Sequence, residues 1–132
     1  MDSFVTFTIN EQIMGIKMLN VERIIKLLKV SPIPDSCDYI EGIIDVQDEL
    51  IPTINLKKKF NFPSQLVGPD SSVIIISEEN EKCGIIVDLV DDIVEVNDTH
   101  VIKTKNNKYV YGVVKINDTI INLLNSNTLV LE

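Results

Sequence analysis

Apolar and polar residues alternate along most of this chain, in short segments that polar turns separate. Alternation with a period of two is typical of β-strands with one buried face. Residues 91–96, where acids alternate with aliphatic side chains, predict one such strand. Four pairs of alternating segments adjoin across a short turn and predict antiparallel pairs; they are 4–10 with 13–18, 39–46 with 50–56, 73–77 with 82–87, and 109–116 with 119–122.

Other stretches do not fit this alternation. After Asn20, which can cap a helix, aliphatic residues between 21 and 28 recur at helical spacing, but the same stretch can equally be a strand. Periodicity leaves both alternatives open. Residues 123–131 predict a short terminal helix and 99–108 a loop. Residues 61–71 contain two prolines and a glycine, which predicts a connection between two parts of the fold.

The second half of the chain repeats the first at an offset of 67 to 70 residues. Glycines and aliphatic residues match in the same order; the matched segments are Gly15-Ile16 with Gly84-Ile85, Gly42-Ile43-Ile44 with Gly112-Val113-Val114, and Ile54-Asn55-Leu56 with Ile121-Asn122-Leu123. This order predicts an internal duplication with units of about 1–65 and 66–132. Because each unit is too small to bury much surface alone, we expect one domain, 1–132, in which both share an interface.

Composition supports the β prediction. Isoleucine and valine supply 36 of the 132 residues, and alanine is absent. β-branched side chains suit pleated strands and lose rotamer freedom in helices. The expected fold class is therefore mostly β: about ten short strands in two five-stranded barrels, with one or two short helices.

Charge argues against a nucleic-acid partner. The net charge is −8, and the one basic run, Lys57-Lys58-Lys59, is expected to be a solvated strand end rather than a phosphate-binding patch. A second group of charges is acidic and is also expected to form a solvated face; it comprises Asp88, Asp91, Asp92, Glu95 and Asp98. Its spacing lacks the rhythm of a calcium-binding loop.

The residues that usually perform catalysis are sparse. His100 is the only histidine, and Cys37 and Cys83 are far apart and without metal-ligand spacing, so we expect no enzyme, metal or cofactor. No apolar run approaches the roughly 20 residues that cross a bilayer. The residues after Met1 do not read as a secretion signal, so we expect a cytoplasmic protein without direct membrane insertion.

The order of these features resembles a known family. Gly15-Ile16 is followed by Val21-Glu22-Arg23-Ile24, then by a proline and by Tyr39-Ile40-Glu41-Gly42, and the second half contains Gly84-Ile85-Ile86-Val87-Asp88 and Tyr111-Gly112-Val113. Over residues 4–124 this order resembles that of CheW-like domains.

The resemblance implies two intertwined SH3-like β-barrels around a shared core, without catalysis or cofactor. It also implies an adaptor in bacterial chemotaxis, which couples the cytoplasmic tip of methyl-accepting receptors to the regulatory domain of the histidine kinase CheA at membrane receptor arrays. Two alternatives stay open: a divergent adaptor of another chemosensory pathway with altered partners, and a small-barrel ligand-binding domain or enzyme.

The family's receptor-binding groove lies between the two barrels, and several positions are carried over to it. The aliphatic positions are Val21, Ile24, Val73, Ile74, Ile86 and Val90, and Arg23 lies among them. Motif and turn positions are Gly42, Gln47, Asp48 and Gly112. Each aliphatic residue fits the barrel core as well as it fits the groove.

Two departures from the family pattern coincide. The family's Asn-Leu-Arg-Gly is Asp45-Val46-Gln47-Asp48 here, and the usual acid beside Ile24 is Arg23. In many members that acid and that arginine are placed to pair. Since both ends have changed, we interpret the change as compensation, with the fold kept and the partner specificity shifted.

Overall fold

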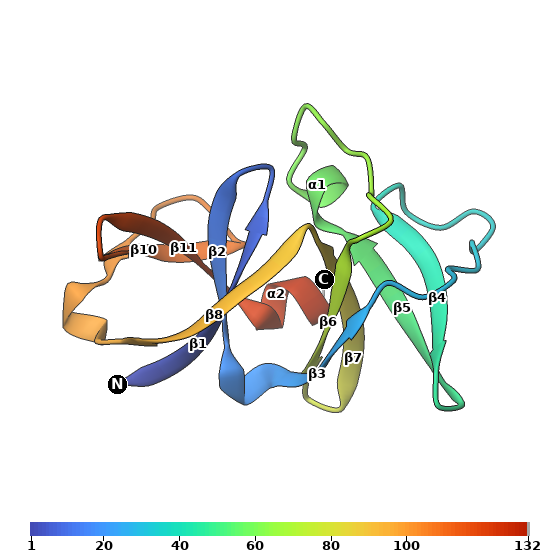
Figure 1. Cartoon of the computed structure of the whole chain (residues 1–132), viewed down its shortest axis with the longest axis horizontal. Coiled ribbons are helices and arrows are strands. Elements are labelled where there is room, and N and C mark those ends of the chain that lie inside the picture. Colours follow the sequence, from blue (N-terminus) through green and yellow to red (C-terminus); the bar gives the residue numbers. More distant parts are fainter. Residues whose placement is uncertain (132) are drawn as a thin grey trace.

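The computed structural model describes residues 1–131 and places their strands in two sheets (Figure 1). Their bounds are β1 Asp2–Ile9, β2 Gln12–Lys17, β3 Val21–Lys26, β4 Ile40–Val46, β5 Glu49–Asn55, β6 Ser72–Glu78, β7 Glu81–Val87, β8 Leu89–Val96, β9 Ile102–Lys103, β10 Val110–Ile116 and β11 Thr119–Leu124. Two short α-helices, α1 Leu56–Lys59 and α2 Ser126–Leu131, follow β5 and β11, and 3-10 turns span Met18–Asn20 and Asp98–His100. The mostly β prediction is confirmed.

One sheet has six strands and the other five. The first, which we call the N lobe, has the order β8-β1-β2-β11-β10-β9; the second, the C lobe, has the order β3-β6-β7-β5-β4. The N lobe exceeds the expected five strands because the predicted loop 99–108 contains β9, a two-residue strand that pairs with β10. The single-turn helix α1 was not predicted, and the terminal helix starts at Ser126 because 123–124 continue β11.

All four predicted strand pairs are present as hairpins. Each turn has two residues at positive φ, the geometry that matches the twist of paired strands; the turn residues are Asn10-Glu11, Gln47-Asp48, Glu79-Asn80 and Asn117-Asp118. Asparagine and aspartate tolerate this conformation better than most residues, so these turns form without glycine.

Residues 21–26 form a strand, so the helical alternative is wrong. In β3, Ile24 lies opposite Ile74 and Ile25 opposite Val73, both on β6. Three of the residues in β3 are β-branched, and pairing with the edge of β6 satisfies their backbone groups. Tertiary pairing therefore decided what the helical spacing of the aliphatic residues left open.

The duplication is visible in the topology. The strands β1, β2, β3, β4 and β5 correspond in order to β6, β7, β8, β10 and β11, and each set ends in a short helix. Matching bulges interrupt both copies: β4 is irregular between Ile40 and Gly42, and β10 between Val110 and Gly112.

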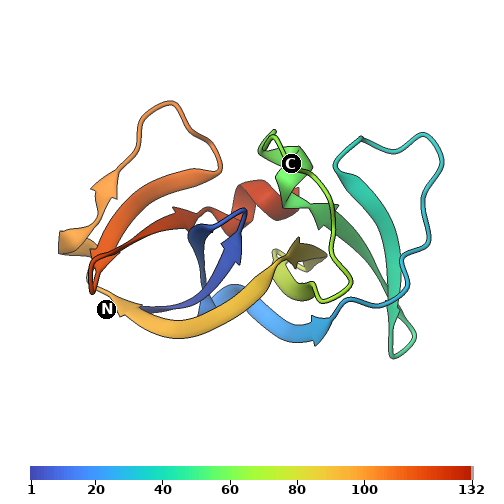
Figure 2. The ribbon, with the colours of Figure 1, turned by 45° about the horizontal axis from the view of Figure 1, so that its top comes forward.

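The sequence halves are not the same as the lobes. The C lobe takes the first two strands of the second half and the last three of the first. The N lobe takes the first two strands of the first half and the last four of the second, β9 included. The parallel pairs β2–β11 and β7–β5 join the two contributions in each lobe. Figures 1 and 2 show β3, in blue, leaving β1 and β2 for the C lobe, and β8, in yellow, returning to the N lobe. A boundary near residue 65 therefore separates the two sequence repeats but does not separate the two sheets.

The structure also corrects one matched segment. The sequence alignment placed Ile54-Asn55-Leu56 against Ile121-Asn122-Leu123, but Asn55 is equivalent to Asn125. The Asn55 N–H donates to the carbonyl of Tyr39 at 2.8 Å, and the Asn125 N–H donates to the carbonyl of Tyr109 at 2.7 Å. Both asparagines then cap the helix that follows, because their Oδ1 atoms accept backbone N–H groups there.

The core is continuous between the lobes. A central cluster unites Phe7 and Ile9 of β1 with Ile74 and Ile76 of β6, and Leu56 of α1 closes one of its sides. Smaller clusters fill the C lobe and the N lobe. Because β1 and β6 are equivalent strands, the shared core lies about the axis that relates the two repeats.

Two residues expected in solvated runs are structural. Lys57 is buried, and its Nζ lies 2.7 Å from Oδ1 of Asp88 and donates to the carbonyl of Leu66 at 2.9 Å. The other oxygen of Asp88 accepts the backbone N–H of Asn10 at 3.0 Å. This arrangement, which we call the Lys57–Asp88 bridge, ties α1 to the turn of the first hairpin and to the segment between β7 and β8.

Candidate partner-binding site

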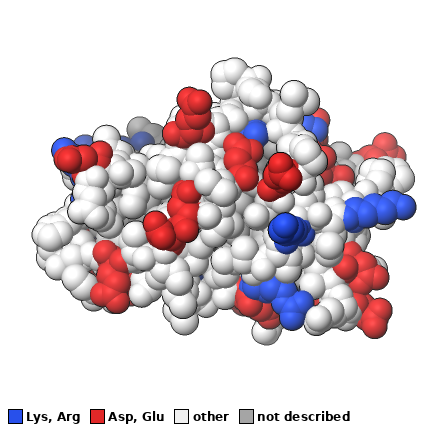
Figure 3. All heavy atoms as spheres, in the orientation of Figure 1, with Lys and Arg blue, Asp and Glu red and all other residues white. Residues whose placement is uncertain are grey.

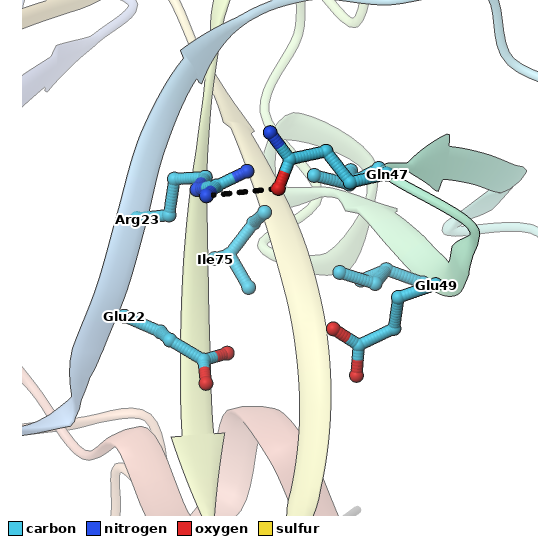
Figure 4. A pocket seen from close by; sticks show the side chains of 7 residues that line it. Glu22, Arg23, Gln47, Glu49 and Ile75 are labelled. Atoms are coloured by element: carbon cyan, nitrogen blue, oxygen red, sulfur yellow. Dashed lines mark hydrogen bonds between the residues drawn. The ribbon is translucent and has the colours of Figure 1, made fainter.

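The turn between β4 and β5 faces the start of β3 across a small cavity on the C lobe. The cavity measures about 220 Å³ and is lined by Glu22, Arg23, Val46, Gln47, Glu49, Ile51 and Ile75. Its apolar lining is buried, whereas its charged residues are exposed. We call it the Arg23 pocket. Figure 4 shows its two sides, with Ile75 of β6 lying between Arg23 and Gln47.

The two residues that depart from the family pattern meet in this pocket. An Nη atom of Arg23 donates to Oε1 of Gln47 at 3.3 Å (Figure 4). The tight turn positions Gln47, because Gln47 and Asp48 take φ values of 51° and 71° and the Asp48 N–H donates to the Asp45 carboxylate. Asp48 is thus a turn residue with an exposed side chain.

Lys82 of β7 forms ion pairs with both acids of the pocket, and the sequence did not indicate it. Its Nζ lies 3.0 Å from a carboxylate oxygen of Glu22 and 2.9 Å from one of Glu49. The hydrogen bond to Glu49, followed by that to Glu22, raises the pKa of Lys82. The three residues come from β7, β3 and β5, so only the sheet order brings them together.

Three of the predicted groove residues belong to the core. Val73 and Ile74 are fully buried and Ile86 is 4% exposed, so none of them offers surface to a partner. The reason is that β6 and β7 are covered on both faces: Ile74 points into the central cluster, and Val73 and Ile86 point into the C-lobe cluster. A strand that is buried on both faces has a continuous run of aliphatic residues, and such a run does not indicate which of them would line a groove.

The remaining aliphatic positions are at least partly accessible. Val21 and Val90 occupy equivalent places in the repeat, are half-buried and pack against the central cluster. Ile24 is 44% exposed and follows Arg23 on β3. Arg23 lines the pocket, whereas Ile24, the next residue of β3, lies on the other face of the strand, the face on which its partner Ile74 joins the central cluster.

The two motif glycines are buried and serve the fold rather than a contact surface. At Gly42, where φ is 151°, an added Cβ would lie 2.2 Å from the carbonyl oxygen of Ser31. At Gly112 it would lie 2.5 Å from a side-chain carbon of Val101. Each glycine lets the segment beside it pack directly on the strand.

Exposed aliphatic residues also lie on the β4–β5 hairpin of the C lobe and on the β10–β11 hairpin of the N lobe. Leu50 is 65% exposed and its equivalent Ile120 is 62% exposed. Beside Leu50 lies a wider groove of about 650 Å³, lined by Leu28, Lys29, Ser31, Pro32, Ile33, Ile43, Asp45 and Leu50. Figure 3 shows acidic side chains over both lobes of one face, with uncharged surface between them.

Within residues 1–131, no group of three or more His, Cys, Asp or Glu residues is placed to hold a metal ion. No helix in this described part of the chain is long and apolar enough to span a membrane. To a partner protein, the described surface offers the small polar Arg23 pocket and the exposed aliphatic side chains of the two hairpins.

Comparison with known proteins identifies the family. The family model of the CheW-like domain matches residues 3–132. The chemotaxis protein CheW of Treponema pallidum (strain Nichols) is 34% identical over 121 residues, which cover 84% of this chain and 71% of that protein. CheW of Bacillus subtilis (strain 168) is 24% identical over 96% of this chain and 85% of that protein.

A solved structure agrees with this match. The crystal structure of the scaffolding protein TtCheW from Thermoanaerobacter tengcongensis superposes with a TM-score of 0.88 at 27% identity, over 94% of this chain and 88% of that one. Together, the family match, the relatives and the intertwined sheets establish that this chain belongs to the CheW-like domain family.

Proposed function

We propose that this chain is a non-catalytic scaffold that couples methyl-accepting chemoreceptors to the histidine kinase CheA in chemotaxis signalling. The observation that carries the proposal is the family match over residues 3–132. Relatives named as chemotaxis proteins and a neighbour titled a scaffolding protein support it. Recruitment to membrane receptor arrays would follow from these contacts.

Two surfaces suit the two partners. The exposed aliphatic side chain of Leu50, on the β4–β5 hairpin, suits the regulatory domain of the kinase, because an exposed apolar surface can pack against a similar surface of a partner. The Arg23 pocket suits the helical tip of a receptor, since a side chain on one face of a helix can enter such a recess.

A titration of the protein against the CheA regulatory domain from the same cell tests the proposal. We expect saturable 1:1 binding, roughly micromolar, as is common for transient signalling interfaces. The matched variants Leu50→Asp and Ile120→Asp place a charge at equivalent hairpin positions of the two lobes. We expect Leu50→Asp to abolish binding and Ile120→Asp to retain it, because one kinase domain covers one lobe.

Two results would count against this assignment. If both variants bind like the unchanged protein, neither hairpin position is the kinase contact. If the folded protein does not bind the domain at about 100 μM, the affinity is too weak for this role, and the chain serves a different kinase.

A further inference from the structure

The Arg23 pocket has an equivalent in the N lobe, of about 300 Å³. At offsets of 69 or 70 residues, the positions of Glu22, Arg23, Val46, Gln47, Glu49, Ile51 and Ile75 are taken there by Asp91, Asp92, Ile116, Asn117, Thr119, Ile121 and Thr6. The two pockets therefore share one backbone arrangement and differ in their side chains. The second pocket is an internal reference for the first.

The charges of the two pockets differ in sign at the key position. Asp92 stands where the Arg23 pocket has its arginine, and Ile13 stands where that pocket has Lys82. Lys82 is taken up by Glu22 and Glu49. In the Arg23 pocket, one lysine is thus shared between two acids, and Arg23 is a separate charge that is not ion-paired to either acid within the described residues.

Most N–H donors of the Arg23 guanidinium form no hydrogen bond within the described residues. The guanidinium carries five N–H donors, and its hydrogen bond within the described residues goes to the neutral amide of Gln47. Within residues 1–131, no carboxylate lies at ion-pair distance from it. Gln47 orients the guanidinium without neutralising it, and the buried side chains of Val46, Ile51 and Ile75 lie beside it.

We propose that Arg23 determines partner specificity by binding a carboxylate of the receptor tip. This inference rests on the proposed function. A carboxylate matches the planar fork of an exposed guanidinium. A lysine or arginine of a partner at this position would be repelled by Arg23, so receptors that carry a basic residue there are excluded.

A bulky polyanion does not suit this site. Glu22 and Glu49 line the same pocket as the guanidinium, and the net charge of the chain is −8, so a group with several negative charges, such as nucleic acid, would meet repulsion. One carboxylate on a largely apolar helix face avoids this repulsion. The size of the cavity, about 220 Å³, also suits a few side-chain atoms rather than a large ligand.

A double-mutant cycle with a receptor fragment tests the inference. The probe is the cytoplasmic hairpin of a methyl-accepting receptor from the same cell, with each Asp or Glu of its tip changed singly to Asn or Gln. We expect Arg23→Gln to weaken binding about threefold to tenfold, the range of an interfacial charge pair. One hairpin variant should show the same loss and then be insensitive to Arg23→Gln.

Two controls separate specificity from fold. Asp92→Asn, at the equivalent position of the N lobe, should leave hairpin binding unchanged, and Arg23→Gln should leave binding to the kinase regulatory domain unchanged. Added salt should weaken hairpin binding by the unchanged protein more than hairpin binding by Arg23→Gln.

The possible failures are distinguishable. If the hairpin binds but Arg23→Gln has no effect, or if no hairpin acid couples to Arg23, the inference is wrong and the proposed function stands. If Asp92→Asn weakens binding as much as Arg23→Gln, the specific role of Arg23 is also refuted. If the unchanged protein does not bind any such hairpin, both the receptor role and the inference fall.

Discussion

At the scale of single residues, the positions that departed from the family pattern became informative once their geometry was known. Arg23 and Gln47 are 24 residues apart in the chain and share a hydrogen bond. Sequence comparison indicated that they changed together, but not what they contact now. Lys82 could not be foreseen, because nothing in its local sequence marks it as a partner of two acids.

The first prediction concerns the change that restores the family's arginine. Gln47→Arg alone should not strengthen receptor binding, because the new guanidinium would face Arg23 where a neutral amide now accepts its hydrogen bond. Repulsion at this exposed site should cost about 0.5 kcal/mol of stability. Calorimetry with the receptor hairpin measures the effect on binding, and a clear gain in affinity would contradict the prediction.

A second prediction uses the two cysteines. Burial raises the pKa of the Cys83 thiol to about 12, whereas Cys37 is exposed. Because the folded state holds the Cys83 proton above the pH at which the unfolded chain loses it, stability should fall as the pH rises above about 9. Urea unfolding at several pH values measures this slope.

The matched control is Cys83→Val, which removes the thiol and should make the decline with pH shallower. A thiol-reactive dye should modify one cysteine, Cys37, in the native protein, and both only after unfolding. Rapid modification of both thiols under native conditions would show that Cys83 is not protected.

At the scale of elements, local turn chemistry and strand alternation predicted the hairpins, while contacts between elements decided the rest. The strand β3 has helical spacing but pairs with β6. The short helix α1 begins after Asn55, whose cap is a local signal that the sequence reading did not use. The bridge between Lys57 and Asp88 joins residues that the sequence placed in two separate solvated runs.

The third prediction tests this bridge. Asp88→Asn leaves the buried Lys57 without its counter-ion and should lower the free energy of unfolding by about 1–2 kcal/mol, less than for a fully buried pair because Asp88 is partly exposed. Asp92→Asn, on the exposed face of β8, is the control and should stay within about 0.5 kcal/mol of the unchanged protein. Denaturant unfolding compares the two, and equal stabilities would show that the bridge contributes nothing.

At the scale of the whole molecule, the exchange of strands makes the two lobes depend on each other. Each sheet uses strands from both sequence halves, and the central core combines β1 with β6. Neither lobe can therefore form from one repeat.

The fourth prediction follows from this exchange. Fragments 1–65 and 66–132, expressed separately, should each lack a cooperative unfolding transition, because each would expose the core face that the other covers. Mixed together they should regain the β signal by circular dichroism, and the intact chain should unfold in a single transition. A fragment that folds by itself would show that its repeat is an independent unit.

By itself, the sequence determined the hairpins, the duplication and the β class. These depend on interactions between neighbours: a period-two alternation places one face inward, and two-residue turns with Asn or Asp fix the local register. The glycines at 42 and 112 were marked by their matching order in the repeat, but the close approach of Ser31 and of Val101 that requires them is a tertiary contact.

Only the tertiary structure decided which strands share a sheet and which aliphatic residues face outward. Val73, Ile74 and Ile24 carry similar side chains, yet the first two are buried and the third is 44% exposed, because β6 is interior and β3 is an edge strand. Likewise, the environment of the Arg23 charge depends on Gln47, in the turn between β4 and β5, and on Lys82, in β7. Burial and charge environment depend on neighbours distant in the chain, and a local pattern does not contain them.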